Sequence, residues 1–394
     1  MTTWIWQQPQ WPNFTWSDAK ILPKLRQLHQ KIGFLLGQSS YDGQSIELSL
    51  ETLLSNIIAS SAIENEKINV YSLRSSLARR LGLSAQQSHP STQRSEGLAN
   101  ILFDALNNIH QELTVERLFQ WHEWLFAEPD WTTAKIRVGQ WRGEEPMQVV
   151  SGRIDKPTIH FEAPPRSDLA QQMMVFIDWF NQSRHNQLLD PLLRAAISHF
   201  WFVTLHPFDD GNGRITRTLT DLALAQMDRQ SIRLYAISSA ILQQRQNYYR
   251  ILEQSQKGNL DISEWLLWFL ETLELSVNQS LQKIERTLLK ARFWQYFAQT
   301  DLHEAQRKVL NRLLDGGGNG FEQGISAAQY QKVAKVSKAT ATRHLTDMLE
   351  KSCLKSIAGG GRSVRYQVNL EVLGSRHPNP LPQERAFSLP VGES

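Results

Sequence analysis

Hydrophobic residues recur mostly at helical spacing along this chain of 394 residues. The segment RAAISHFWFVTL, from Arg194 to Leu205, is typical of a buried helix that ends before Pro207. A second helix is expected to start at the glycines near 211 and to run through ITRTLTDLALAQM. An earlier helical face is lined by Ile46, Leu50, Leu53, Leu54, Ile57 and Ile58. The pattern predicts a mainly α-helical protein.

One region between Gly139 and Arg166 interrupts the helical pattern. Its glycines and prolines flank the short β-prone pieces QVV and TIHF. Two such pieces close together predict a small β-hairpin on an otherwise helical body.

The C-terminal region has a different layout. QYQKVAKV predicts a short helix, Ser337 an N-cap after a turn, and ATRHLTDMLEKSCL a second helix. GGGR followed by SVRYQV predicts a two-stranded wing. Helix, turn, helix and wing is the order of a winged helix-turn-helix, in which the second helix enters a DNA major groove.

Length and composition narrow the class of protein. The length favours two or three domains, and no run of about 18 apolar residues predicts a membrane helix. The N-terminus lacks the basic and apolar regions of a secretory signal. A single cysteine, Cys353, excludes intramolecular disulfides and a multi-cysteine metal site, which fits the cytoplasm. The net charge of +3 is too small to imply a nucleic-acid partner by itself.

The candidate chemistry lies in HPFDDGNGRITR, residues 206–217. Gly211 and Gly213 allow a tight turn whose N–H groups converge, and the helix that starts there adds its positive end, which favours an anion. Arg214 and Arg217 are three residues apart, so both guanidiniums lie on one helix face, where they can grip phosphate oxygens. A turn between helices with capping residues is the simpler alternative.

Two further side chains suit a phosphate site. Asp210 offers the hard oxygen ligand that Mg²⁺ prefers, in a site shared with substrate phosphates. His206 is the one group whose ordinary pKa lies near neutrality, which suits a general base. Asp209 is interpreted as a solvated neighbour.

Residues 206–217 resemble the signature of the Fic (Fic/Doc) family, His-x-Phe-x-Asp/Glu-Gly-Asn-Gly-Arg-x-x-Arg. Every specified position is filled, by His206, Phe208, Asp210, Gly211, Asn212, Gly213, Arg214 and Arg217. The resemblance implies a helical Fic core with a β-hairpin flap and transfer of AMP from ATP to a Ser, Thr or Tyr hydroxyl of a target protein. His206 would then be the general base and Asp210 the Mg²⁺ ligand. The 211–213 loop would cradle the phosphates, and Arg217 would bind the γ-phosphate.

The resemblance extends to the hairpin and to a downstream segment. Family members dock an extended target segment on the flap by strand addition. In this chain the flap residues that border the ATP site would be Val149, Val150, Ser151 and Gly152. Tyr249 and Gln256 are similar in position to residues that border the adenine, although core packing of Tyr248 and Tyr249 is an alternative.

SSAIENEK, residues 60–67, resembles the family's inhibitory motif, Ser/Thr-x-x-x-Glu-Gly/Asn, which Ser60, Glu64 and Asn65 fill. The resemblance implies an ion pair between Glu64 and Arg217 that removes the γ-phosphate clamp. A solvated helix end is the alternative. The stretch 11–16, WPNFTW, is similar to the start of a small helical domain that precedes the core in one bacterial subgroup.

The C-terminal region is rich in basic residues, and a basic helix and wing fit contact with phosphate backbones. Ser337, Thr342 and His344 lie on or near the second helix and could reach bases. A fold reused for dimerisation or target docking is the alternative. The candidates for DNA contact are Lys338, Thr340, Arg343 and Arg362.

These expectations give four regions: an N-terminal helical domain with the inhibitory motif (1–110), a Fic catalytic domain (111–285), a winged helix-turn-helix (286–375) and a tail (376–394). The leading hypothesis is an autoinhibited, ATP- and Mg²⁺-dependent protein adenylyltransferase without a membrane partner, and the family resemblance allows a homodimer. The alternatives are a DNA-binding transcriptional regulator with a nucleotide-sensing Fic domain, and a Fic enzyme that removes AMP or transfers phosphate.

Overall fold

The computed structural model describes residues 3–39, 45–83, 89–128, 136–153, 156–228, 234–316, 321, 323–357 and 364–374. The chain divides into two compact units, Met1–Ser280 and Leu281–Ser394. The predicted tail (376–394) and Arg362 lie outside the described residues. The domain boundaries expected at 110 and 285 remain predictions.

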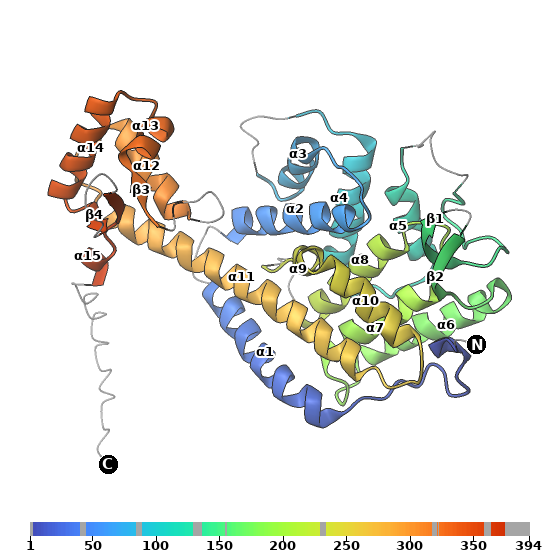
Figure 1. Ribbon diagram of the computed structural model, residues 1–394. Coiled ribbons are helices and arrows are strands. Elements are labelled where there is room, and N and C mark those ends of the chain that lie inside the picture. The colour runs from blue at the N-terminus through green and yellow to red at the C-terminus, as the bar shows by residue number, and fades with distance from the viewer. Residues whose placement is uncertain are drawn as a thin grey trace, which may run out of the picture. The chain divides into compact units, whose positions relative to one another are not determined.

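The described strands of the first unit form one hairpin, and its other described elements are helices, as the periodicity predicts (Figure 1). The long helix α11 (Ser263–Tyr296) begins in this unit and continues into the second. The other helices of the first unit are η1 (Ile5–Gln7), α1 (Asp18–Ser39), α2 (Ser45–Ile63), α3 (Val70–Arg80), α4 (Gln93–Asn107), α5 (Val115–Leu125), α6 (Arg166–Ser183), α7 (Pro191–Leu205), α8 (Asn212–Asp228), α9 (Ile237–Gln243) and α10 (Arg245–Gln256).

Helix α7 forms the centre of this unit. The Asp190 side chain accepts a hydrogen bond from Leu192 N at 2.8 Å, and Pro191 takes the first helical position, where its missing N–H costs nothing. Every residue from Leu192 to Leu205 is buried, and the helix packs against α8. The apolar sequence of α7 therefore fixes the position of the residues that immediately follow it.

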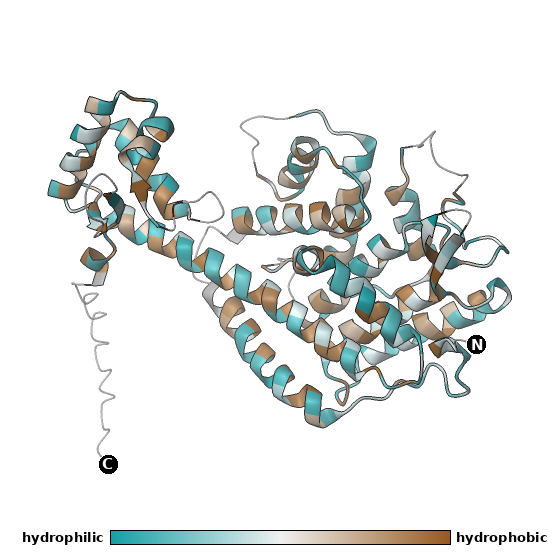
Figure 2. Ribbon diagram, viewed as in Figure 1, coloured by the Kyte–Doolittle hydropathy of each residue, from teal (hydrophilic) through white to brown (hydrophobic). Residues whose placement is uncertain are grey.

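Helix α2 is the other strongly apolar element. Its window Ile46–Ile63 is long and apolar enough to cross a membrane by length and composition alone, whereas no such run was expected from the sequence. Within the protein, 56% of this window is buried, and α2 packs against α3, α8 and α9. Figure 2 shows hydrophobic and hydrophilic positions interleaved along α2 and α11, as expected of helices that bury one face.

The predicted hairpin is present, formed by β1 (Gln148–Arg153) and β2 (Lys156–Glu162). The strands are antiparallel with Gln148 opposite Glu162, and the register shifts between Val149 and Val150. Aromatic residues of the N-terminal segment pack against its base. Trp4 meets Phe161 edge-on at 5.4 Å, and the Trp6 indole donates to Glu162 O at 2.7 Å. The first residues of the chain thus brace the hairpin.

The second unit contains short helices and a three-stranded antiparallel sheet with strand order β3-β5-β4. Its core includes Val309, Tyr330, Leu345 and Met348. Along the chain its elements beyond α11 are α12 (Glu304–Asp315), β3 (Ile325–Ser326), α13 (Ala327–Ala334), α14 (Lys338–Glu350), β4 (Leu354–Ile357), β5 (Arg365–Val368) and α15 (Glu371–Gly374).

The turn between α13 and α14 contains the N-cap that was predicted at Ser337. Lys335 adopts a left-handed conformation that ends α13, and the Ser337 side chain accepts from Thr340 N to begin α14. The strands β4 and β5 lie on either side of residues 358–363, which are outside the described part of the chain.

Candidate active site

His206 ends helix α7 in an unusual backbone conformation. Its φ of 50° is left-handed, and its N–H donates to Phe202 O at 3.1 Å. A left-handed non-glycine residue costs about 1 kcal/mol or more, a cost that structures tend to carry at functional sites. The conformation turns the chain from α7 into the loop that leads to α8.

The hydrogen bond of the His206 ring identifies its basic nitrogen. Nδ1 lies 3.1 Å from Val203 O, and because a carbonyl can only accept, Nδ1 carries the proton. Nε2 of the neutral ring is then the atom with a free lone pair. Burial lowers the pKa of His206 below its ordinary value, although the Val203 carbonyl opposes the shift. The ring is therefore neutral at pH 7 and able to accept a proton.

Asn212 holds the loop between the two helices in shape. Its Oδ1 accepts from Phe208 N at 2.9 Å, and its Nδ2 donates to Phe208 O at 2.7 Å. The side chain is buried and committed to the loop. Of the cradle predicted at 211–213, Asn212 can thus offer its backbone N–H.

The N-terminus of α8 has the properties of an anion site. Gly211 has a φ of +82°, which glycine adopts without strain, and α8 begins at the next residue. The first N–H groups of a helix have no intrahelical acceptor. Among the described residues of the signature loop and α8, two buried guanidinium nitrogens, Arg214 Nε and Arg217 Nη1, also lack a hydrogen-bond partner. The start of α8 thus carries hydrogen-bond donors that a phosphate could use.

Asp210 is the candidate metal ligand. Its side chain is 55% exposed, and Oδ1 accepts from Gly211 N at 2.5 Å and lies 3.5 Å from Arg214 Nη2. Within the described ranges, no group of three or more His, Cys, Asp or Glu side chains could hold a metal ion. One accessible carboxylate fits Mg²⁺, which proteins often hold through one or two carboxylates and substrate phosphates.

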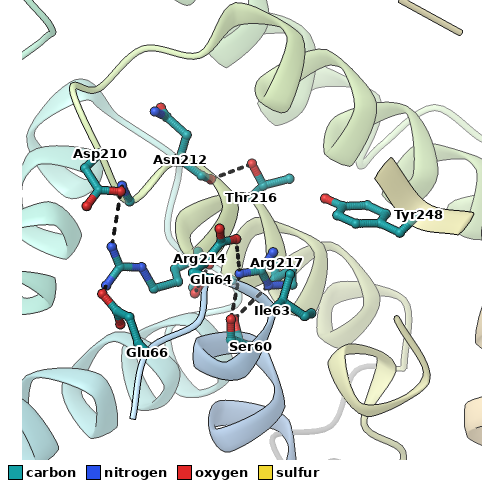
Figure 3. A network of polar contacts seen from close by, with 12 residues as sticks. Ser60, Ile63, Glu64, Glu66, Asp210, Asn212, Arg214, Thr216, Arg217 and Tyr248 are labelled. Atoms are coloured by element: carbon teal, nitrogen blue, oxygen red, sulfur yellow. Dashed lines mark hydrogen bonds and ion pairs between the residues drawn. The ribbon is translucent and has the colours of Figure 1, made fainter. Parts of the chain in front are cut away.

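Arg217 is bound on one side by the end of helix α2 (Figure 3). Its Nε donates to Ser60 Oγ, and its Nη2 donates to Ser60 O and to Glu64 Oε1, each at 2.8 Å. The Arg217 side chain is 1% exposed. The ion pair predicted from the inhibitory motif is present in the structure.

The Glu64 carboxylate lies directly over the start of α8. A methyl group placed on Gly213 would be 2.1 Å from Glu64 Oε1 and 3.1 Å from Arg217 Nη1. Because a real side chain cannot approach this closely, only glycine at 213 lets the carboxylate reach the helix N-terminus. The carboxylate therefore occupies space at the predicted anion site itself.

The charges of this pair stabilise each other. Burial alone would raise the pKa of Glu64, but the charge and hydrogen bond of Arg217 lower it below its ordinary value. Burial would lower the pKa of Arg217, and the Glu64 charge raises it. Both groups are ionised at neutral pH.

Asn65, the last residue of the predicted inhibitory motif, has a backbone conformation that favours Gly or Asn. Helix α2 stops at Ile63, so Glu64 lies just past the helix end, and Asn65 has a left-handed φ of 60°. The Glu66 N–H reaches back to Ser61 O at 2.9 Å, the long bond of a Schellman cap. Asn65 Oδ1 also accepts from Arg245 Nη1 at 2.8 Å. The cap holds Glu64 at a fixed place.

Arg142 and His122 position the loop but were not predicted. The buried Arg142 donates from Nε to His206 O at 2.9 Å and from Nη2 to Pro164 O at 2.5 Å. His122 Nδ1 accepts from Gly139 N, so its Nε2 carries the proton and donates to Asp210 O, each at 3.1 Å. Burial lowers the pKa of His122 to about 4. Arg142 lies in the region between Gly139 and Arg166 that predicts the hairpin, but its residue type there does not indicate this role.

Asp209 is not the solvated neighbour that was expected. Its Oδ2 accepts from Arg137 N and its Oδ1 from Gly143 N, each at 3.1 Å. The carboxylate thereby ties the segment before the hairpin to the loop.

The predicted flap residues lie on strand β1. Val149 and Val150 are exposed, and Gly152 has a φ of +93°. Ser151 Oγ lies 2.6 Å from His160 Nε2, and His160 Nδ1 lies 2.8 Å from Glu253 of α10. These contacts connect the hairpin to the body of the unit.

Tyr249 and Gln256, the two residues predicted to border the adenine, differ in how exposed their side chains are. The hydroxyl of Tyr249, which is partly exposed, donates to Ile63 O at 3.2 Å, and this places it beside the end of α2. Gln256 is instead buried, and its amide donates to Thr204 Oγ1 at 3.1 Å. The side chain of Gln256 thus makes a core hydrogen bond in this structure, and its contact with adenine stays a prediction.

In the second unit, Lys338 and Arg343 are exposed on α14, and Thr340 is partly exposed. His344, expected to reach bases, is buried, and its Nδ1 lies 3.0 Å from the Tyr330 hydroxyl. Because its side chain faces the core, His344 cannot contact DNA bases in this conformation.

Comparison with known proteins agrees with this site. Residues 112–224 match the Fic/DOC family, and residues 4–83 match a separate family described as a domain of unknown function, DUF4172. The chain contains a Fic/DOC domain, which includes the signature loop. The segment predicted to be inhibitory, residues 60–65, falls within the other match.

Proteins named "Protein adenylyltransferase Fic" are similar to this domain. The one from Nematostella vectensis is 32% identical over 116 residues, 29% of this chain and 26% of that protein. The one from Drosophila melanogaster is 35% identical over 97 residues, 25% of this chain and 18% of that protein. The similarity thus spans about a quarter or less of these relatives.

A solved structure extends the likeness to most of the chain. A Fic family protein from Desulfovibrio desulfuricans G20 aligns with a TM-score of 0.51 at 19% identity, over 91% of this chain and 98% of that one. At this identity the likeness concerns the fold.

Proposed function

We propose that this protein transfers AMP from ATP to a hydroxyl side chain of a target protein, and that Glu64 holds the site inactive. The observation that carries the proposal is the arrangement in one loop of a neutral histidine, a helix N-terminus, an accessible carboxylate and two arginines, with Glu64 bonded to Arg217 at 2.8 Å. The adenylyltransferase relatives support the same reaction.

The reaction follows from the groups in the loop. The target hydroxyl oxygen attacks the α-phosphorus of ATP in line, the bond to the bridging oxygen of the β-phosphate breaks, and pyrophosphate leaves. His206 Nε2 takes the hydroxyl proton. The N–H groups at the start of α8 and the guanidinium of Arg214 stabilise the charge of the phosphates. Bound Mg²⁺, held by Asp210, would supply further positive charge.

The hairpin offers a place for the target. In the described part of the chain, β1 and β2 pair only with each other, so an extended segment can add to a free edge. The exposed side chains of Val149, Val150 and Ile159 suit an apolar residue of that segment.

ATP labelled in either the α- or the γ-phosphate tests the reaction. With Mg²⁺, cell lysate and the Glu64→Gly variant, the α label is expected to enter protein and the γ label to leave in pyrophosphate. Protein labelled by the γ-phosphate would establish phosphate transfer instead. Loss of AMP from labelled protein on adding the variant would establish removal of AMP. Either result contradicts the proposal.

A second candidate function, DNA binding, is supported by helix α14. Lys338 and Arg343 are exposed, whereas Ala341, Leu345 and Met348 of the same helix are buried in the core. This leaves a basic face free on the second helix of a helix-turn-helix arrangement, which we propose to be a winged helix.

Titration of duplex DNA with the full chain across salt concentration tests this candidate. We expect binding at low salt, and the Lys338→Ala/Arg343→Ala variant should reduce the slope of log K against log salt by about 2, since each lost phosphate contact removes about 1. The exposed pair Lys20→Ala/Arg250→Ala is the matched charge control. Absence of binding at low salt refutes the candidate and favours dimerisation or target docking.

A further inference from the structure

A second carboxylate, Glu66, engages the other signature arginine. Arg214 Nη1 donates to Glu66 Oε1 at 2.6 Å, although the two residues are 148 positions apart in the sequence. The other oxygen, Glu66 Oε2, lies 2.8 Å from Arg94 Nη2 of helix α4. The Arg214 side chain is 6% exposed. Glu66 is thus an ionic partner of a nearly buried arginine within the candidate active site (Figure 3).

The surroundings of Arg214 leave little room for a phosphate while Glu66 is in place. Its Nη2 faces Asp210 Oδ1 at 3.5 Å, and its guanidinium lies over the Phe126 ring at 5.1 Å. Asp210 is accessible and can bind Mg²⁺. Of the two carboxylates, Glu66 makes the shorter contact with Arg214. To accept a hydrogen bond from Arg214 Nη1, a phosphate oxygen must therefore displace the Glu66 carboxylate.

Glu64 and Glu66 belong to the same capping structure. The Glu64 and Glu66 N–H groups both donate to Ser61 O, at 3.0 and 2.9 Å. The two carboxylates thus project from one short segment, one toward each arginine. Together they place two negative charges where the triphosphate is expected, and such like charges disfavour its binding.

Arg94 gives Glu66 a partner that is not part of the signature. When Arg214 turns to a phosphate, the Glu66 carboxylate can keep its contact with Arg94, so its charge is not left unpaired near the protein interior. Arg94 is therefore expected to favour release, because it remains an ionic partner of Glu66 after Arg214 has turned away.

We infer that Glu66 is a second inhibitory residue, which competes with nucleotide phosphate for Arg214 as Glu64 competes for Arg217. The inference rests on the proposed function and deepens it: full access of ATP requires displacement of both carboxylates. It also assigns Arg94 an opposing part, since Arg94 keeps the Glu66 carboxylate paired once Arg214 binds phosphate.

Isothermal titration of ATP into single and double variants tests this inference. Glu66→Gln keeps the shape of the side chain and removes its charge, so we expect it to tighten ATP binding about two- to tenfold, both alone and in the Glu64→Gly background. Arg94→Met should weaken ATP binding about two- to fivefold, since Glu66 then has Arg214 as its remaining partner. A general loss of folding would not move the two variants in opposite directions.

The controls separate this inference from the proposed reaction. Glu51→Gln, at a surface ion pair of α2 with Arg74, is the matched control and should leave ATP affinity unchanged. Unchanged or weaker ATP binding by Glu66→Gln in the Glu64→Gly background overturns the inference, and weaker binding would make Glu66 a residue that positions Arg214. Tighter ATP binding without any AMP transfer leaves the inference standing and overturns the proposed reaction. Absence of ATP binding in every variant overturns both.

Discussion

Replacing His206 by alanine is expected to lower AMP transfer by about a hundredfold to ten-thousandfold, the usual contribution of a general base. The experiment is best made in the Glu64→Gly background, where transfer is not held back by the ion pair with Arg217. The measurement is the initial rate at which label from α-labelled ATP enters protein.

The size of the effect follows from the position of the ring. Val203 O fixes the proton on Nδ1, and burial keeps the ring neutral, so Nε2 is a free base at neutral pH. None of the other groups in the loop can replace it. Arg214 and Arg217 are cations without an acceptor, and the Asp210 carboxylate is the expected Mg²⁺ ligand.

Two controls keep the result interpretable. His185→Ala changes an exposed histidine after α6 and should leave the rate unchanged. The ATP affinity of the His206→Ala variant should also be close to that of its parent, because His206 acts on the hydroxyl proton rather than on the triphosphate. Transfer that persists in His206→Ala at the parental rate contradicts the mechanism.

Replacing Glu64 by glycine is expected to increase AMP transfer about tenfold to a hundredfold. The carboxylate makes a charge-assisted hydrogen bond to the buried Arg217 and lies over Gly213. Hydrogen bonds to charged groups contribute about 1.5–3 kcal/mol, which corresponds to this range of rates once the bond no longer competes with ATP.

The matched control for this variant is Glu47→Gly, at an exposed position near the start of the same helix. It introduces glycine into α2 without touching the arginines, so its rate should equal that of the unmodified protein. Thermal unfolding of both variants checks that the helix is retained. A Glu64→Gly rate equal to or below that of the Glu47→Gly control contradicts inhibition by Glu64.

The local parts of the site could be predicted because their signals are local. Glycines at 211 and 213 mark a turn, and arginines three residues apart share a helix face wherever the helix packs. The hairpin and the α13–turn–α14 arrangement were predictable for the same reason. The ion pair of Glu64 with Arg217 required a family resemblance, since the two residues are 153 positions apart.

The other contacts of the site depend on tertiary packing, and no local sequence pattern predicts them. Nothing near Arg142 indicates that its guanidinium serves two backbone carbonyls instead of a carboxylate. Gln256 follows a tyrosine-containing segment and resembles a surface residue, but α10 turns it inward toward Thr204. Glu66 looks like an ordinary solvated charge until α8 brings Arg214 beside it.

Competition between Glu64 and the outer phosphates of ATP for Arg217 is the basis of the proposed inhibition. Its most direct test compares the affinities of ATP and AMP for the unmodified protein and for Glu64→Gly by titration calorimetry. We expect the variant to bind ATP at least about tenfold more tightly, while its affinity for AMP, which lacks the outer phosphates, changes little. Equal ATP affinities in the two proteins, or the same gain for AMP as for ATP, would contradict it.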